Sequence, residues 1–69
     1  METWPIWNGD RLAGYIRRTD AGGYDWLGLW RTGKSQGTAP AFAAALSALQ
    51  TGYGAIAAER PHLLIGPSR

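Results

Sequence analysis

From Thr38 to Ala58 the chain carries no charged side chain, and this segment limits how the rest can fold. Larger apolar side chains and one alanine recur along it at the spacing of one helix face: Phe42, Ala45, Leu46, Leu49 and Tyr53. Alanine dominates the segment, whereas membrane-spanning helices rely on Leu, Ile, Val and Phe. We therefore predict a helix that packs within the protein or against a partner and does not cross a membrane.

Residues that usually cap or interrupt helices predict where this helix begins and ends. Thr38 is a favourable residue before a helix start. Gly52 and Gly54 are expected to end or kink the helix, because glycine is a poor helix former. The expected elements are a helix over about residues 39–52 and a smaller C-terminal element over residues 55–66.

Small size and the absence of cysteine restrict how the fold is stabilised. The 69 residues include no cysteine, which excludes disulfides and thiolate metal sites, and the single His62 cannot build a zinc site alone. Such a short chain buries only about 60% of its unfolded surface. Its four Trp, three Tyr and one Phe must supply the packing, or a partner must. We expect one domain over residues 1–69, cytoplasmic because no secretory signal is present, with no cofactor and no metal.

The first half of the chain has the pattern of an antiparallel sheet. Asn8-Gly9 lies between apolar runs, which is a strong hairpin signal. The segment 19–23, TDAGG, has the composition of a second turn. The expected strands are 4–7, 11–18 and 24–31. The predicted fold class is α+β, with a three-stranded antiparallel meander over about residues 4–31 packed on one alanine-rich helix.

The loop length of the second hairpin decides which side chains share a face, because a shift of one residue turns a strand over. A four-residue loop, Asp20 to Gly23, pairs Thr19 with Tyr24. It is preferred because it separates an aliphatic face from a basic and aromatic one. A three- or five-residue loop mixes these sets and places Arg17 opposite Asp25, which is also attractive.

Residues 28–35, GLWRTGKS, match the phosphate-binding pattern G-x-x-x-x-G-K-[ST]. Their context does not support nucleotide binding. A helix after the motif would contain Gly37 and Pro40, and an interior proline costs about 3 kcal/mol. So short a chain also cannot supply the parallel sheet with helices on both faces that carries such loops. We interpret the motif as a strand end, Gly28 to Arg31, and a polar connection, Thr32 to Gly37.

No catalytic constellation is recognisable in the sequence. Asp10 and Asp20 fall in predicted turns, where Asp is common, and His62 has no predicted nucleophile beside it. We therefore expect a binding protein and not an enzyme.

The preferred register gathers basic and aromatic side chains on one sheet face. The candidate binding residues on this face and at its ends are Arg11, Tyr15, Arg17, Trp26, Trp30, Arg31 and Lys34. Rings interleaved with arginine can stack on bases and hold phosphates, so nucleic acid, in particular DNA, is the expected partner. The same residue types anchor protein interfaces, which leaves a protein partner as the alternative. In a third interpretation, Trp26 and Trp30 cover a small core from the second side of the sheet, with residues 4–7 folded over them.

Three strands with Arg and Trp, followed by one helix, resemble in architecture the plant Apetala-type and integrase arm-binding DNA-binding domains over roughly residues 10–52. This resemblance implies that one sheet face meets the major groove through Arg11, Arg17, Trp26, Trp30 and Arg31. The uncharged helix and the apolar Leu29 and Trp30 depart from that pattern. The series RLAGYIRR, GGYDWLGLW and an alanine-rich helix also resembles small orphan proteins of bacteriophages and mobile elements. Some of those bind and inhibit host proteins, and a homodimer through the helix fits that alternative.

Overall fold

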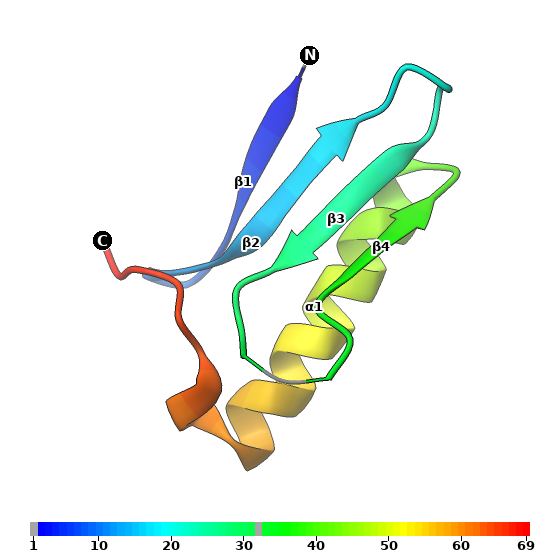
Figure 1. Cartoon of the computed structure of the whole chain (residues 1–69). Helices are drawn as coiled ribbons and strands as arrows, with labels where there is room; N and C mark the ends of the chain where they lie inside the picture. The colour runs from blue at the N-terminus through cyan, green and yellow to red at the C-terminus, as the bar shows by residue number, and fades with distance from the viewer. Residues whose placement is uncertain (1, 32) are drawn as a thin grey trace.

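The computed structural model describes residues 2–31 and 33–69 and shows one four-stranded antiparallel sheet with a helix on one face (Figure 1). The strands are ordered β1-β2-β3-β4 across the sheet. This confirms the predicted α+β class and the antiparallel meander, and it adds a fourth strand. The elements are β1 (Thr3–Asn8), β2 (Arg11–Arg18), β3 (Tyr24–Gly28), β4 (Gln36–Ala39), α1 (Phe42–Glu59) and the short 3₁₀ helix η1 (Pro61–Leu63).

Strand β4 is formed by residues for which the sequence predicts a connection and the start of the helix. Thr38, expected to cap the helix, instead lies in β4 opposite Asp25 of β3. Just before β4, the Gly28 N–H donates a hydrogen bond of 2.6 Å to the Ser35 carbonyl. α1 begins only at Phe42. The backbone groups along the outer side of β3 need partners, and β4 supplies them.

Helix α1 runs through both of its glycines to Glu59, so the prediction that they end or kink it is wrong. Gly52 has a packing role, since a Cβ atom there would lie 2.7 Å from the indole of Trp30. A Cβ atom at Gly54 would meet nothing within 4 Å. Glycine costs about 1 kcal/mol relative to alanine inside a helix, and at Gly52 the indole contact offsets that cost. Residues 55–59, predicted as part of a separate element, belong to the helix.

Strands β2 and β3 pair one residue away from the preferred register. Arg17 lies opposite Asp25, which leaves a three-residue loop, residues 20–22. The four-residue loop is therefore wrong, and the alternative with the facing charges is the one observed. In this register Ile16 lies opposite Trp26, so both point to the α1 side of the sheet, where both are buried.

Turn chemistry accounts for the shorter loop. Gly22 has a φ of 87°, a left-handed conformation that favours glycine. The Thr19 N–H donates to the Gly23 carbonyl at 2.9 Å, and the Gly23 N–H donates back to Thr19 Oγ1 at 3.2 Å. The first hairpin is confirmed as predicted, with a two-residue loop of Gly9 and Asp10 and a φ of 61° at Gly9.

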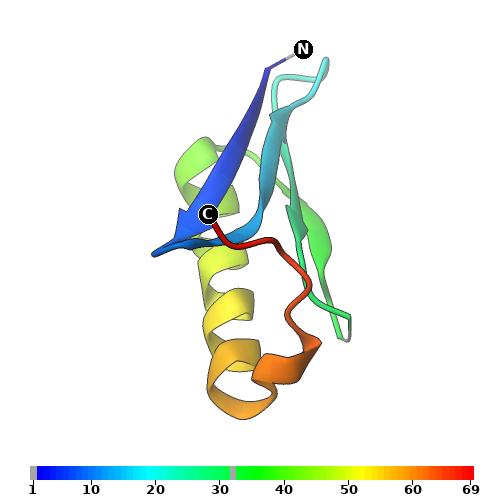
Figure 2. The same ribbon diagram turned by 90° about the vertical axis from the view of Figure 1, so that its left-hand side faces the viewer.

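The core lies between the sheet and α1, which covers one face only (Figure 2). Ile16 of β2 and Leu49 of α1 are the largest of its fully enclosed side chains. Trp30 lies against two glycines, Gly28 at the end of β3 and Gly52 in α1, so that the indole fills the space between sheet and helix. A second aromatic group closes one end of the core, with ring centres 5.2 to 6.2 Å apart: Trp4, Tyr24 and Phe42.

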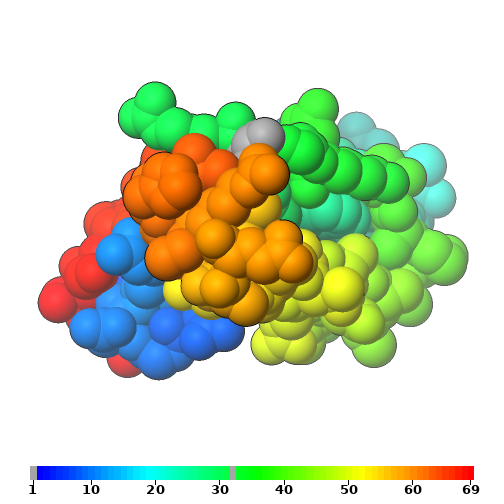
Figure 3. Space-filling view, turned by 90° about the horizontal axis from the view of Figure 1, so that it is seen from below, coloured from blue at the N-terminus to red at the C-terminus, as the bar shows by residue number. Residues whose placement is uncertain are grey.

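The C-terminal segment, residues 64–69, bridges the start of β2 and the residues that follow β3. The Leu12 N–H donates to the Pro67 carbonyl at 2.9 Å, and the Ile65 N–H donates to the Leu29 carbonyl at 3.0 Å. Figure 3 shows this segment, in red, beside the first strands, in blue. The end of the chain is therefore tied to the sheet by backbone hydrogen bonds.

Candidate binding face

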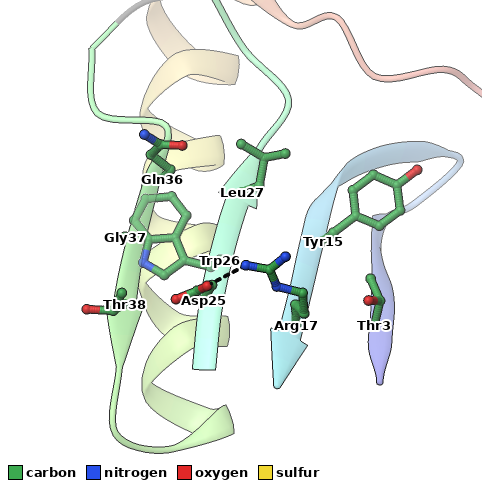
Figure 4. Close-up of a pocket in the computed structure, with 9 residues that line it drawn as sticks. All are labelled: Thr3, Tyr15, Arg17, Asp25, Trp26, Leu27, Gln36, Gly37 and Thr38. Carbon is green, nitrogen blue, oxygen red and sulfur yellow. Dashed lines mark hydrogen bonds and ion pairs between the residues drawn. The ribbon is translucent and has the colours of Figure 1, made fainter. Parts of the chain in front are cut away.

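No other helix or strand of the described chain covers the sheet face turned away from α1 (Figure 2), and Figure 4 shows side chains that lie on it. Alternate residues of all four strands reach it, as expected for an antiparallel sheet with one solvated face. We call it the open face. Pro5 of β1 lies on it opposite Tyr15. Its other residues are Thr3, Tyr15, Arg17, Asp25, Leu27, Gln36 and Thr38. With Trp26 and Gly37 they line a hollow of about 740 Å³.

Two large apolar side chains form the centre of the open face. Tyr15 of β2 and Leu27 of β3 lie directly opposite each other across the strand pair. They are 37% and 43% exposed, although most apolar side chains of this size in the chain are buried or half-buried. The pair offers apolar area next to a polar surround, which is typical of an interaction surface.

The charges on the open face neutralise each other. Arg17 Nη2 donates to Asp25 Oδ2 at 2.8 Å, and the open face carries no other charged side chain. Both side chains remain partly exposed, so the pair contributes at most about 1 kcal/mol to stability. Its consequence is electrostatic, because the face carries no net charge.

Only two of the sequence-predicted binding residues, Tyr15 and Arg17, lie on the open face. Trp26 and Trp30 are 6% and 4% exposed and belong to the core, because the shorter loop turns β3 over relative to β2. The expected common face of basic and aromatic residues is therefore wrong. Both tryptophans are core residues, as the third interpretation has it, but that core lies between the sheet and α1 and not on the second side of the sheet. Trp26 also contributes to the lining of the hollow, beside Gly37 (Figure 4).

The remaining predicted residues lie elsewhere. Arg11 is half-buried and its Nη1 donates to the Gly66 carbonyl at 2.9 Å, so it holds the C-terminal segment. Arg31 and Lys34 are exposed in the connection between β3 and β4. Thr32, assigned to the same connection, lies outside the described residues.

The phosphate-loop pattern leads into a strand. Lys34 and Ser35 are followed directly by β4, whereas the pattern's chemistry requires a helix N-terminus at this point. Trp30, in the middle of the pattern, is buried in the core. The interpretation of GLWRTGKS as a strand end and a connection agrees with these positions, although β3 itself ends at Gly28.

Sequence reasoning missed the other members of this face: Thr3, Pro5, Asp25, Leu27, Gln36 and Thr38. The facing charges of Arg17 and Asp25 were the usable signal, because the register that pairs them also brings Leu27 beside Tyr15. Gln36 and Thr38 had no such signal, since the strand that presents them was not predicted.

The wider chemistry of the chain is limited. Across residues 2–31 and 33–69, no group of three or more His, Cys, Asp or Glu side chains could hold a metal ion. No helix in this part of the chain combines the length and the apolar character needed to cross a membrane. Comparisons with protein-family models, with curated proteins and with solved structures find no match to this chain. The open face is therefore interpreted from its own residues.

Proposed function

We propose that this chain is a non-enzymatic binding module that holds an extended segment of a partner protein on its open face. The observation that carries the proposal is the exposed pair of Tyr15 and Leu27 at the centre of an uncovered sheet face. Tyrosine is a frequent anchor of protein interfaces, because it adds a large apolar area and a hydroxyl group.

The surroundings of this apolar pair favour a polypeptide. Thr3, Gln36 and Thr38 supply hydrogen-bond donors and acceptors around the hollow. The Arg17–Asp25 pair offers both a cation and an anion to a partner and repels neither charge. A peptide chain, with alternating apolar and polar groups, matches such a mixed and neutral surface.

Nucleic acid is the second candidate, and Tyr15 next to Arg17 is the observation that favours it. One exposed ring beside a guanidinium can stack a base and contact a phosphate. The support is smaller than for a protein partner, since the tryptophans are in the core and Asp25 already pairs with Arg17. Arg31 and Lys34 are further exposed cations, in the connection before β4.

Selection of peptides from a displayed random library, followed by affinity measurement, tests the proposed function. We expect selected peptides to contain an apolar residue and to lose about tenfold to hundredfold in affinity with Leu27→Ala and with Tyr15→Ala. Ile65→Ala is the matched control, because Ile65 is 49% exposed but does not line the hollow.

The same variants distinguish the two candidates. Binding of a single-stranded oligonucleotide that falls steeply with salt and depends on Tyr15 but not on Leu27 would favour nucleic acid. Selected peptides that bind the Tyr15 and Leu27 variants as tightly as the original protein would contradict the protein-binding proposal.

A further inference from the structure

The two edges of the sheet differ in how they are protected against pairing with another strand. Edge strand β1 contains Pro5, and its pairing with β2 shifts between Ile6 and Trp7, as at a β-bulge. Proline and bulges are the devices that natural sheets use to block edge pairing. Edge strand β4, residues 36–39, contains no proline and no charged side chain. Nothing in the described chain lies along its outer side, which Figure 1 shows at the right-hand edge.

The outward backbone groups of β4 can be assigned from the hydrogen bonds of the sheet. Gly28 and Ser35 form a hydrogen-bonded pair, and such pairs alternate along an antiparallel ladder. Gly37 and Ala39 therefore direct their N–H and C=O groups to β3, as Ser35 does. Gln36 and Thr38 direct theirs away from the sheet.

We propose that β4 pairs with β4 of a second copy of this chain, antiparallel and about a twofold axis, to form a continuous eight-stranded sheet. In the register where both outward residues find partners, Gln36 of each copy lies opposite Thr38 of the other. Each of these two pairs exchanges two hydrogen bonds. Gly37 then lies opposite Gly37 on the axis, where strands approach closely and glycine has no side chain to obstruct them.

Charge distribution favours a second copy at this edge in spite of the net charge of +2. The edge itself is uncharged, and a second copy would bring its helix to the same side of the sheet as α1. Residues 42–58 of α1 carry no charge, so the approaching helices present no like charges to each other. The pairing is isologous and closes at two copies.

The inferred dimer goes beyond the proposed function and extends the surface that serves it. A twofold axis perpendicular to the sheet keeps both open faces on the same side, so the two hollows join across β4. Pairing four strand residues buries less than the roughly 800 Å² per partner of a standard interface. We therefore expect a weak dimer, with a dissociation constant on the order of 100 µM.

Analytical ultracentrifugation across about 10 µM to 1 mM protein tests the inference. We expect a monomer at the low end and a dimer at the high end for the original chain. The double variant Gln36→Lys, Thr38→Lys should remain monomeric, because each pair of facing residues becomes two cations. The double variant Gln36→Lys, Thr38→Glu should dimerise at least as well as the original, because each lysine then lies opposite a glutamate of the other copy.

A charge-matched control separates edge pairing from general repulsion. The double variant Thr3→Lys, Asn8→Lys adds the same charge on the β1 edge and should leave the dimer unchanged. A monomer at every concentration, assemblies that grow beyond two copies, or equal weakening by both β4 double variants would overturn the inference. Circular dichroism of each variant serves as the folding control, so that loss of the dimer can be distinguished from unfolding.

Discussion

Replacing Trp30 with alanine is expected to remove about 3 to 5 kcal/mol from the free energy of unfolding. The indole is 4% exposed and lies between Gly28 of the sheet and Gly52 of the helix, so its removal leaves a cavity that the neighbouring glycines cannot fill. A chain of this length has about 3 to 10 kcal/mol in total. The Trp30→Ala variant should therefore lose between about a third and all of its stability, which urea or thermal unfolding followed by circular dichroism would measure.

Tyr15→Ala is the comparison that makes this result informative. Tyr15 is also aromatic, but it lies on the open face and is 37% exposed. Its truncation should cost less than about 1 kcal/mol, as is usual for surface substitutions. Equal losses for both variants, or a Trp30→Ala variant as stable as the original chain, would contradict the assignment of Trp30 to the core and Tyr15 to the binding face.

The second large effect is that replacing each of two helix glycines with alanine should change the free energy of unfolding in opposite directions. Gly52→Ala should destabilise the protein by about 1 to 3 kcal/mol, because the added methyl group would lie 2.7 Å from the Trp30 indole and force it to move. Gly54→Ala should stabilise it by about 0.5 to 1 kcal/mol, because its Cβ atom meets nothing within 4 Å and alanine is the better helix former.

Urea unfolding of the two alanine variants beside the original chain measures this difference directly. Because the two substitutions are chemically the same and only two residues apart, their helix propensity terms are alike. Stabilisation of both variants to a similar extent would show that Trp30 does not pack against Gly52.

Features decided by local chemistry were predictable from the sequence. Asn8-Gly9 marked the first hairpin, and the apolar stripe that includes Leu49 and Tyr53 marked the buried face of the helix. The two helix glycines show the limit of such signals. Gly52 and Gly54 look equivalent in sequence, and only the position of Trp30, contributed by a distant part of the chain, distinguishes them.

Strand β4 and the register of the second hairpin depend on tertiary structure. The residues Gln36 to Ala39 have little strand propensity of their own, and they become a strand because β3 has an unpaired edge beside them. The register depends on Gly22 and Thr19, which stabilise a three-residue loop. Separation of an aliphatic face from a basic and aromatic face pointed to the wrong register, because in the structure Trp26 and Trp30 share the core with aliphatic side chains such as Ile16.

That register determines everything proposed for the open face. A shift of one residue would exchange Leu27 and Trp26 between the two sides of the sheet. With Trp26 and Trp30 on the uncovered side, the surface would be basic and aromatic, and nucleic acid would be the better partner. With Tyr15 and Leu27 there, the surface is neutral and apolar at its centre, and a protein segment is the better partner.

The cross-strand contacts between α-protons of β2 and β3, measured by nuclear Overhauser effects, test this central claim most directly. Residues 13 and 29 form a hydrogen-bonded pair, so Ile16 and Trp26 form a non-hydrogen-bonded pair with closely spaced α-carbons. The structure predicts a strong effect between the α-protons of Ile16 and Trp26, and another between those of Arg18 and Tyr24. A strong effect between the α-protons of Arg17 and Trp26, or of Ile16 and Leu27, would show the other register and contradict the open face described here.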